Sequence, residues 1–258
     1  MEVVILCGGK GTRLSEETIT KPKPMVEIGG KPILWHIMKS FSNYGYKKFI
    51  LALGYKGHII KDFFYNARIN QSDFTLKMDP LKPIVFHNTI IENDWEISFI
   101  DTGEETLKGG RLKKIEKLIK SDDFFVTYGD GVSNINLKSL FEFHMKSLKI
   151  ATVSAVRPPS RFGELSLNGD NVESFEEKPQ MNDGYINGGF FVFNKKLFNF
   201  LEDNDNCDLE FGALQKIAEL GQMNAFRHND FWQCMDNIRE KNYLNQLAKE
   251  GNEYWLKS

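Results

Sequence analysis

A glycine-rich loop follows the first apolar run of the chain. The run Val3–Leu6 has the residue types of a buried strand, and the hexapeptide Gly8–Arg13 reads GGKGTR. Such a turn at the end of a first strand lets backbone N–H groups approach a phosphate closely. It lacks the GxxxxGK(S/T) spacing of a P-loop and the third glycine of the GxGxxG dinucleotide motif. Taken alone, the loop indicates either a phosphate site or a tight connection from a strand to a helix.

Cations gather around this loop. Between residues 8 and 31 there are five of them, against three anions. The five are Lys10, Arg13, Lys21, Lys23 and Lys31. Lys21 and Lys23 each precede a proline, which restrains them to extended backbone and fixes two ammonium groups on a stiff segment. This cluster is suited to a polyanion, although runs of charge are also common on solvated faces.

Two aspartates are candidates for binding a metal ion. Asp130 lies between two glycines after the predicted strand Phe124–Thr127, at the carboxyl edge where open α/β sheets bind ligands. Asp236 comes just before the predicted helix 239–250, where it is equally a candidate for the helix N-cap. Mg²⁺ prefers carboxylate oxygens and water. An aspartate in a glycine turn is also common for structural reasons alone.

Two further segments are suited to a single phosphate or a sugar. Lys178 follows Glu177 and precedes a proline, after the predicted strand Val172–Phe175. A restrained lysine of this kind can grip one phosphate, but a turn with solvated charges explains the segment as well. Asn187 and Gly188 combine an amide with a glycine inside a strand-like run. That pattern is typical of a bulge or of the close approach of a ligand.

Short strand-like runs alternate with helical segments along the chain, which is typical of an α/β sheet with crossover helices. The predicted strands are 3–6, 49–53, 96–100, 124–127, 151–156, 163–167, 172–175, 185–193 and 223–227, and the predicted helices are 32–44, 58–65, 110–120, 137–147, 210–220 and 239–250. The half after residue 150 is expected to be more antiparallel. Residues 66–94 are polar and weakly periodic, so we predict a less regular insertion there. No linker or repeat divides the chain, and we expect a single domain over residues 1–258.

The composition is that of an ordinary globular protein. The 258 residues are 41% apolar and 26% charged, and the formal net charge of -2 gives no global attraction for nucleic acid or an anionic membrane. Three cysteines far apart, without CxxC spacing, argue against a disulfide framework and a zinc site. No apolar run approaches the roughly 20 residues of a membrane helix, and the N-terminus lacks the pattern of a signal peptide. We expect a cytoplasmic protein that binds neither nucleic acid nor membrane.

The motifs together resemble the signature of the sugar-phosphate nucleotidyltransferase family. The family reads LxGGxGTRL, then a lysine-containing KPK or SKQ segment, then KP, and the matching segments are Leu6–Leu14, Lys21–Val26 and Gly30–Pro32. Cys7 stands where the family usually has alanine. The resemblance covers nearly the whole chain. It implies a Rossmann-like α/β fold with a mixed, mostly parallel sheet flanked by helices, of the nucleotide-diphospho-sugar transferase type.

The resemblance also implies roles for particular residues. In the family the glycine loop cradles a triphosphate, and cations matching Arg13 and Lys23 neutralise phosphate charge as pyrophosphate leaves. A GD dipeptide and a W-x-x-x-D segment supply two aspartates that hold one Mg²⁺, and these match Asp130 and Asp236. The implied catalytic residues are Arg13, Lys23, Asp130 and Asp236. The implied nucleotide-binding residues are Leu6, Cys7, Gly8, Gly9, Lys10, Gly11, Thr12, Arg13, Lys23, Thr102, Arg111, Gly129 and Asp130. The implied sugar-phosphate-binding residues are Gly163, Glu177, Lys178, Asn187 and Gly188.

Several segments resemble one subgroup of this family, whose members transfer the cytidylyl group of CTP to α-D-glucose 1-phosphate. They include GYKG at 54–57, DTG at 101–103, GGRLK at 109–113 and TYGDGV at 127–132. The reaction gives CDP-glucose and pyrophosphate by direct in-line attack, without a protein nucleophile. This product suggests a place in making the dideoxysugars of surface polysaccharide, such as O-antigen. Subunits of this subgroup assemble through the middle segment, often as hexamers, so residues 66–94 are a candidate homo-oligomer contact.

Other functions stay open at this point. The same chemistry with dTTP or UTP differs by a few contacts in the base pocket, which the sequence does not display. A catalytically silent nucleotide-binding regulator is less consistent with having both aspartates and all the lysines in place. A nicotinamide dehydrogenase would need a third glycine and an acidic residue about 20 positions further on, where a lysine-rich segment stands instead.

Overall fold

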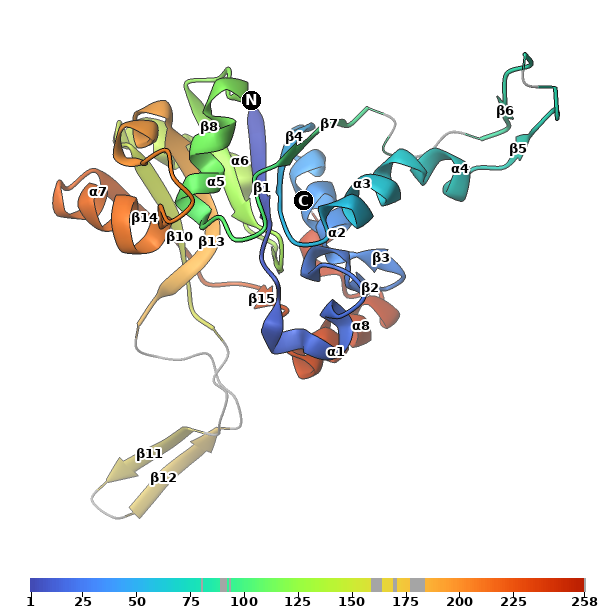
Figure 1. Ribbon diagram of the computed structural model, residues 1–258. Coiled ribbons are helices and arrows are strands. Elements are labelled where there is room, and N and C mark those ends of the chain that lie inside the picture. The colour runs from blue at the N-terminus through green and yellow to red at the C-terminus, as the bar shows by residue number, and fades with distance from the viewer. Residues whose placement is uncertain are drawn as a thin grey trace.

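The computed structural model describes residues 1–79, 81–88, 92, 94–158, 164–168, 171–176 and 184–257. At its centre is a seven-stranded sheet (Figure 1). Its strands, in spatial order, are β14 (Met223–His228), β10 (Ala151–Val156), β13 (Ile186–Asn194), β8 (Asp123–Tyr128), β1 (Glu2–Cys7), β4 (Lys48–Leu53) and β7 (Glu96–Asp101). Neighbouring strands run parallel except at β13, which is antiparallel to both β8 and β10. The expected fold class, a mixed and mostly parallel Rossmann-like sheet, is confirmed.

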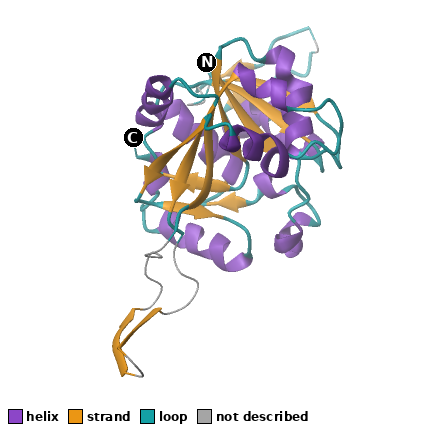
Figure 2. Cartoon of the chain, turned by 90° about the vertical axis from the view of Figure 1, so that its left-hand side faces the viewer, coloured by secondary structure: helices purple, strands orange, loops and turns teal. Residues whose placement is uncertain are grey.

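Helices cover both faces of this sheet (Figures 1 and 2). One face carries α2 (Ile33–Asn43), α3 (Gly57–Tyr65), α6 (Leu137–Ser147) and α8 (Ile238–Lys249). The other carries α5 (Lys108–Ile115), α7 (Gln215–Glu219) and the helical turns η4 (Lys195–Phe200) and η5 (Leu209–Leu214). Side chains alternate along β1, so that Val3 and Ile5 enter the first core, while Val4 and Leu6 enter the second. Because both faces are covered, β1 is apolar at nearly every position, as buried parallel strands are.

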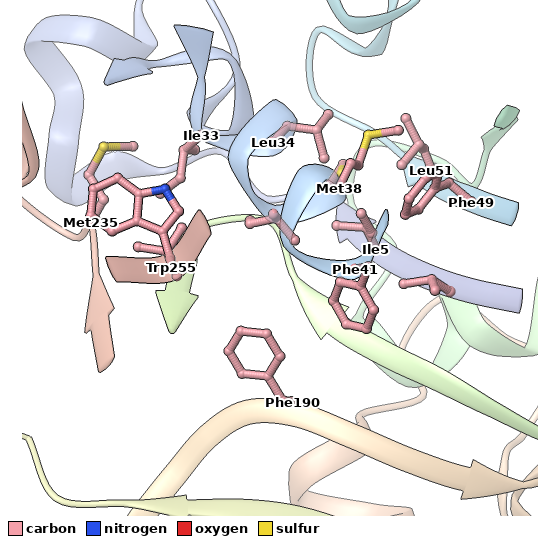
Figure 3. Close-up of a cluster of buried hydrophobic side chains, with 14 of the residues drawn as sticks. Ile5, Ile33, Leu34, Met38, Phe41, Phe49, Leu51, Phe190, Met235 and Trp255 are labelled. Atoms are coloured by element: carbon pink, nitrogen blue, oxygen red, sulfur yellow. The ribbon is translucent and has the colours of Figure 1, made fainter. Parts of the chain in front are cut away.

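The helix α2 fills much of the first core (Figure 3). Its apolar residues recur at spacings of three or four, so Ile33, Ile37 and Phe41 fall on one buried face. The C-terminal end of the chain returns to the same core, where Trp255 is 1% exposed and its Nε1 donates to Nδ1 of His36 at 3.1 Å. Burying each of these large apolar side chains contributes about 2 kcal/mol. The two ends of the chain are therefore packed into one core.

Four short antiparallel pairs stand apart from the central sheet in the part of the chain described. They are β2 (Glu27–Ile28) with β3 (Lys31–Pro32), β5 (Phe74–Thr75) with β6 (Val85–Phe86), β9 (Gly131–Ser133) with β15 (Trp232–Cys234), and β11 (Glu164–Asn168) with β12 (Asn171–Glu176). No sequence pattern predicts the first three pairs, because strands of two or three residues carry too little periodicity. The pair of β9 and β15 connects the segments that carry Asp130 and Asp236.

Most predicted helices and strands are confirmed within one or two residues. The predicted helix 110–120 begins earlier, as α5, and continues beyond Ile115 as the 3₁₀ turn η3 (Glu116–Leu118), and the predicted helix 210–220 divides into η5 and α7. The described part of residues 66–94 contains the short elements α4 (Ala67–Gln71), β5 and β6. The expectation that the second half is more antiparallel is confirmed by the pairing of β13 with β8 and β10 and of β11 with β12, whereas β10 and β14 pair in parallel. These two strands are parallel because β13 first leads the chain back to the end of the sheet where β10 begins, and β14 starts from that same end after η4, η5 and α7.

Short helical turns complete the described chain. They are η1 (Thr12–Leu14), α1 (Ser15–Thr18), η2 (Lys23–Met25) and η6 (Tyr254–Leu256). The first three lie between β1 and β2, where η1 carries Arg13 and η2 carries Lys23. Among the helices described, none combines the length and the apolar character that crossing a bilayer requires.

Candidate active site

A cavity of about 540 Å³ opens at the carboxyl edge of the parallel strands. Its wall is built from the loop after β1, the turn after β8, the beginnings of α5 and β13, and the segment around β15. Most residues predicted for the site line it: Leu6, Cys7, Gly8, Gly9, Gly11, Thr12, Arg13, Lys23, Arg111, Gly129, Asp130, Asn187, Gly188 and Asp236. The topology therefore gathers residues from both ends of the chain around one cavity.

Two residues predicted for nucleotide binding lie outside the cavity wall. The ammonium group of Lys10 pairs with Glu105, with Nζ 2.5 Å from Oε1, and both side chains are exposed. Thr102 is buried, and its Oγ1 donates to the carbonyl oxygen of Leu53 at 2.6 Å and accepts from Nη1 of Arg111 at 2.7 Å. Thr102 therefore positions Arg111 and does not itself face the cavity.

The residues predicted for the sugar phosphate are described only in part. Three of them lie outside the described residues, namely Gly163, Glu177 and Lys178. Asn187 and Gly188 stand at the beginning of β13 and line the cavity. A β-carbon on Gly188 would lie 2.6 Å from Oγ of Ser154, so a side chain there would clash. The glycine in this strand therefore has a packing reason as well as a place at the cavity.

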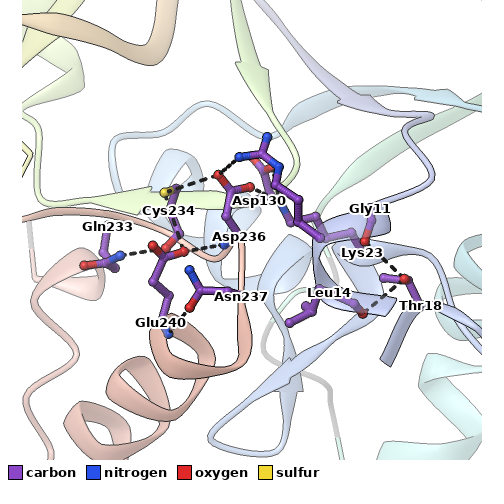
Figure 4. A network of polar contacts seen from close by, with 11 residues as sticks. Gly11, Leu14, Thr18, Lys23, Asp130, Gln233, Cys234, Asp236, Asn237 and Glu240 are labelled. Carbon is purple, nitrogen blue, oxygen red and sulfur yellow. Dashed lines mark hydrogen bonds and ion pairs between the residues drawn. The ribbon is translucent and has the colours of Figure 1, made fainter. Parts of the chain in front are cut away.

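A lysine joins the two candidate metal ligands (Figure 4). Nζ of Lys23 lies 2.6 Å from Oδ2 of Asp130 and 2.5 Å from Oδ1 of Asp236. The other carboxylate oxygen of Asp236 accepts from Nη1 of Arg13 at 2.8 Å. The side chain of Lys23 is 11% exposed, against 31% for Asp130 and 19% for Asp236. All four residues predicted to be catalytic thus form one ion cluster in the cavity wall.

The charge state of Lys23 results from two opposing effects. Burial lowers the pKa of Lys23, but the charge of Asp130 and the hydrogen bonds to Asp130 and Asp236 raise it by more, so the pKa lies above its usual value. The side chain is therefore an ammonium ion at neutral pH. With Arg13, it balances the two carboxylates that it contacts.

Backbone pairing brings the two aspartates together. β9 and β15 pair in an antiparallel register that sets Gly131 opposite Cys234. One step further, the N–H of Met235 donates to the carbonyl oxygen of Asp130 at 2.8 Å. This pairing joins the turn after β8 to the segment before α8. Residues far apart in the sequence are thereby held at adjacent positions of one short ladder.

Asp236 is not the N-cap of α8, so that alternative from the sequence is wrong. The cap is Asn237, whose side chain accepts from the N–H of Glu240 at 3.0 Å. The carboxylate of Glu240 accepts in turn from the N–H of Asp236 at 2.6 Å. Because Asn237 caps the helix and Glu240 reaches back to the N–H before the cap, the carboxylate of Asp236 is not needed there and can face Lys23 and Arg13.

The two aspartates fit a divalent metal in donor type and in placement. Their carboxylate oxygens converge on one cationic atom, Nζ of Lys23, and carboxylate oxygens are the ligands that Mg²⁺ prefers. Cys234 lies beside them, with Sγ 4.0 Å from Oδ2 of Asp236. Burial, together with the charges of Glu240 and Asp236, raises the pKa of Cys234 to about 12. In the protein without a metal ion the thiol therefore stays protonated at neutral pH, and the charged donors beside it are carboxylate oxygens.

The glycine loop packs against a buried arginine. Arg111 is 4% exposed, and its guanidinium donates to the carbonyl oxygens of Leu53 at 3.0 Å, Gly103 at 2.7 Å and Gly8 at 3.2 Å. A β-carbon on Gly8 would lie 2.0 Å from the guanidinium carbon, so only glycine fits there. Burial lowers the pKa of Arg111, yet an arginine stays charged in proteins. Arg111 therefore fixes the glycine loop relative to the ends of β4 and β7.

A second polar network lines the cavity beside Asn187. The hydroxyl of Tyr128 donates to Oε1 of Glu210 at 2.6 Å and accepts from Nδ2 of Asn187 at 3.1 Å. Lys108 pairs with the same carboxylate, and its Nζ lies 4.7 Å from the centre of the Tyr128 ring. Burial and the charge of Glu210 raise the pKa of Tyr128, so the phenol stays protonated. No motif predicts Lys108 or Glu210. Only Tyr128, directly before the Gly129 and Asp130 dipeptide, carries a signal in the sequence.

Comparison with known proteins agrees with this geometry. A model of the nucleotidyl transferase family matches residues 2–255. The chain is 47% identical to glucose-1-phosphate cytidylyltransferase of Salmonella typhimurium over 256 residues, covering 99% of this chain and 98% of that one. It is 40% identical to a Bacillus subtilis protein named "Probable glucose-1-phosphate cytidylyltransferase", over 99% of each chain. The fold is similar to that of a UDP-glucose pyrophosphorylase, with a TM-score of 0.67 at 16% identity, covering 97% of this chain and 98% of that one.

Proposed function

The chain belongs to the nucleotidyl transferase family, and we propose that it transfers the cytidylyl group of CTP to α-D-glucose 1-phosphate, giving CDP-glucose and pyrophosphate. The choice of substrates rests on the cytidylyltransferases that the chain resembles at 47% and 40% identity. The observation that carries the chemistry is the ion cluster of Lys23, Asp130 and Asp236 beside the glycine loop. This cluster combines two carboxylates for a metal with a cation for a phosphate in one cavity.

We assign the triphosphate of CTP to the glycine loop. Gly8–Gly11 offers backbone N–H groups, and the side chain of Arg13 is 75% exposed, so it can turn from Asp236 to a phosphate. Lys10 is also exposed and can exchange Glu105 for the leaving pyrophosphate. An oxygen of the sugar phosphate attacks the α-phosphorus in line, and the bond from this phosphorus to the bridging oxygen of the β-phosphate breaks. No protein nucleophile is needed, because positioning and charge neutralisation carry the rate.

We propose that Asp130 and Asp236 hold Mg²⁺. When bound, the ion supplies charge neutralisation and orientation at the phosphate oxygens. Lys23 then gives up at least one of its two carboxylate contacts, and its ammonium group turns to the α-phosphate.

For the acceptor we propose Asn187 and Gly188 in the cavity wall, together with three residues outside the described part of the chain, namely Gly163, Glu177 and Lys178. Asn187 is oriented for this by its hydrogen bond to Tyr128. The attacking phosphate is assigned to Lys178 on the family resemblance alone.

The proposal is tested by measuring pyrophosphate release with glucose 1-phosphate and Mg²⁺ across CTP, dTTP, UTP, ATP and GTP. We expect kcat/KM for CTP to exceed that for each other nucleotide by at least about 100-fold, because a wrong base leaves buried polar groups of the pocket unpaired. A preference for dTTP or UTP would support the proposed transfer reaction but contradict CTP as its nucleotide. Release with none of the five would favour a nucleotide-binding regulator.

We also propose that the enzyme is a homo-oligomer, with a hexamer as the size implied by the family, assembled through the segment that follows α3. The arm formed by α4, β5 and β6 projects from the body in Figure 1. It carries strongly exposed apolar side chains, with Met78 89% and Leu81 88% exposed. Large exposed apolar groups gathered on one projection are typical of an interface.

Changing both Met78 and Leu81 to lysine is expected to convert the oligomer to a monomer, measured by size-exclusion chromatography with light scattering. Leu148→Lys is the matched control, because Leu148 is 89% exposed at the end of α6, far along the chain from the arm. A monomeric wild-type protein, or a double variant of unchanged mass, would contradict this interface.

Two broader assignments complete the proposal. A single domain over residues 1–258 is supported by the central sheet, which takes neighbouring strands from both halves of the chain. We place the enzyme in the cytoplasm, where the thiols of its three free cysteines stay reduced. Its product would feed the synthesis of dideoxysugars such as those of O-antigen.

A further inference from the structure

Two arginines contact one tyrosine ring at the carboxyl edge of the central sheet. The guanidinium carbon of Arg157 lies 4.8 Å from the centre of the Tyr185 ring, and that of Arg227 lies 5.6 Å from it. The hydroxyl of Tyr185 donates to Oδ1 of Asn229 at 3.0 Å, which fixes the ring. Among the residues described, neither guanidinium has a carboxylate partner. Two positive charges are thus held on one ring without a compensating anion from this part of the chain.

One of these groups also has a donor with nothing to bind. Nε of Arg157 is buried and has no hydrogen-bond partner within the described chain. A buried donor left without an acceptor is unfavourable, and so is the repulsion between two like charges. An anion at the two guanidinium groups would offset their repulsion, because the planar fork of arginine matches the oxygens of a phosphate.

The arginines stand in register with the acceptor side of the cavity. Ala155 of β10 is paired with Asn187 of β13 on one side and with Arg227 of β14 on the other. Residues paired across neighbouring strands point to the same face, so Asn187, Ala155 and Arg227 form one row. Strands lie about 4.8 Å apart, which puts the Cα atoms of Arg227 and Asn187 about 10 Å from each other. The long side chain of Arg227 can cross most of that distance over a small alanine.

The tyrosine and the other arginine share this face. Tyr185 precedes Asn187 by two residues, and Arg157 follows Ala155 by two residues. Side chains two residues apart on an extended chain point to the same side, in agreement with the observed contacts of both arginines with the ring. The group is therefore continuous with Asn187 and with the network of Tyr128 and Glu210 behind it.

We propose that Arg157 and Arg227, held by Tyr185, form a binding site for the phosphate monoester of the incoming sugar phosphate. This inference rests on the proposed function and deepens it, since it assigns the entry of the acceptor to residues that no motif identifies. The acceptor is a dianion, and the proposed function places a triphosphate in the same cavity. Two arginines at its point of entry offset this repulsion and raise the local concentration of the acceptor. The site therefore acts on the affinity for the acceptor and leaves the affinity for CTP unchanged.

The first test is steady-state kinetics on the variant with both Arg157→Met and Arg227→Met. We expect KM for glucose 1-phosphate to rise about tenfold, with kcat and KM for CTP within twofold of wild type. The variant with both Arg157→Lys and Arg227→Lys keeps the charges. Its KM for glucose 1-phosphate is expected to lie between that of wild type and that of the double methionine variant. Lys257→Met is the matched control, because Nζ of Lys257 also lies over a ring, 5.2 Å from the centre of that of Tyr254. An unchanged KM for glucose 1-phosphate, or an equal rise for CTP, would overturn the proposal.

A second measurement separates this inference from the proposed function. Inorganic phosphate is titrated into the wild-type protein and the double methionine variant by calorimetry, without nucleotide. We expect binding that weakens about tenfold in the variant and that weakens with salt, as charge-dependent binding does. Equal binding to both proteins would reject the arginine site even if CDP-glucose is formed. Arginine-dependent binding in a protein inactive with all five nucleotides would reject the proposed function and keep the phosphate site. If the double variant does not fold, Arg227→Met alone replaces it in this titration, because Arg227 is exposed.

Discussion

Asp130→Asn is expected to lower kcat for pyrophosphate release at least about 10³-fold while the fold stays intact. The amide has nearly the same size and can still accept a hydrogen bond from Lys23, which lies 2.6 Å from Oδ2 of the aspartate. What it loses is the negative charge that a divalent cation needs. Binding of Mn²⁺, followed by electron paramagnetic resonance without nucleotide, should weaken in parallel. This second readout tests the metal site independently of turnover.

The control for this variant is Asp62→Asn, which removes the same charge from an exposed position on α3. Its turnover and metal binding should stay within twofold of wild type. Circular dichroism and Tm show whether either variant has lost its fold. Near-normal turnover of a folded Asp130→Asn protein would remove Asp130 from the metal site and with it the mechanism proposed for the cavity.

Lys23→Met is expected to have the second largest effect. It should lower turnover and the stability of the metal-free protein, and it should increase the stabilisation by Mg²⁺. Turnover should fall at least about 100-fold, because the α-phosphate loses its cation. The metal-free protein should lose about 2 kcal/mol of stability, or roughly 4–8 °C in Tm, since two partly buried carboxylates are left facing each other. The same repulsion should make the two carboxylates bind Mg²⁺ more tightly than they do in wild type. The increase in Tm on adding Mg²⁺ should therefore be larger in the variant than in wild type.

Lys39→Met provides the comparison for Lys23. Lys39 also pairs with a carboxylate, with Nζ 3.4 Å from Oε1 of Glu92, and its side chain is 23% exposed. We expect this variant to turn over normally and to show the wild-type response to Mg²⁺. If Lys23→Met responded to Mg²⁺ no more than Lys39→Met does, the ammonium group would not be competing with the metal for Asp130 and Asp236.

The fold was largely predictable because its main elements carry their own periodicity. The strand β1 is apolar at nearly every position, and α2 repeats apolar residues at helical spacing, so neither needs information from elsewhere. The short ladder of β9 and β15 was not predictable, since three residues on each side have no period of their own. The parallel pairing of β10 and β14 likewise depends on the path of the chain through β13 and α7 and not on either strand.

In the candidate site, too, residues in local motifs were predictable and residues brought together by the fold were not. The glycine loop, Lys23, Asp130 and Asp236 were identified because each lies in a short motif. The contact of both aspartates with Nζ of Lys23 arises only from the tertiary structure, and so does the capping of α8 by Asn237 instead of Asp236. The network of Tyr128, Lys108 and Glu210 was missed because its members come from three separate elements. The arginine site was missed for a related reason, since only the register of β10, β13 and β14 brings its residues together.

The burial of Arg111 bears on how the molecule opens. One side chain from α5 holds carbonyl oxygens at the ends of β1, β4 and β7 at the same time. If α5 detaches from the sheet, all three carbonyl oxygens lose the guanidinium at the same time, so this one side chain couples the segments that carry them. The glycine loop and its neighbours should therefore share one opening free energy in hydrogen exchange, as members of a single cooperative unit. The end of the cavity that carries the glycine loop is assembled, and lost, as a whole.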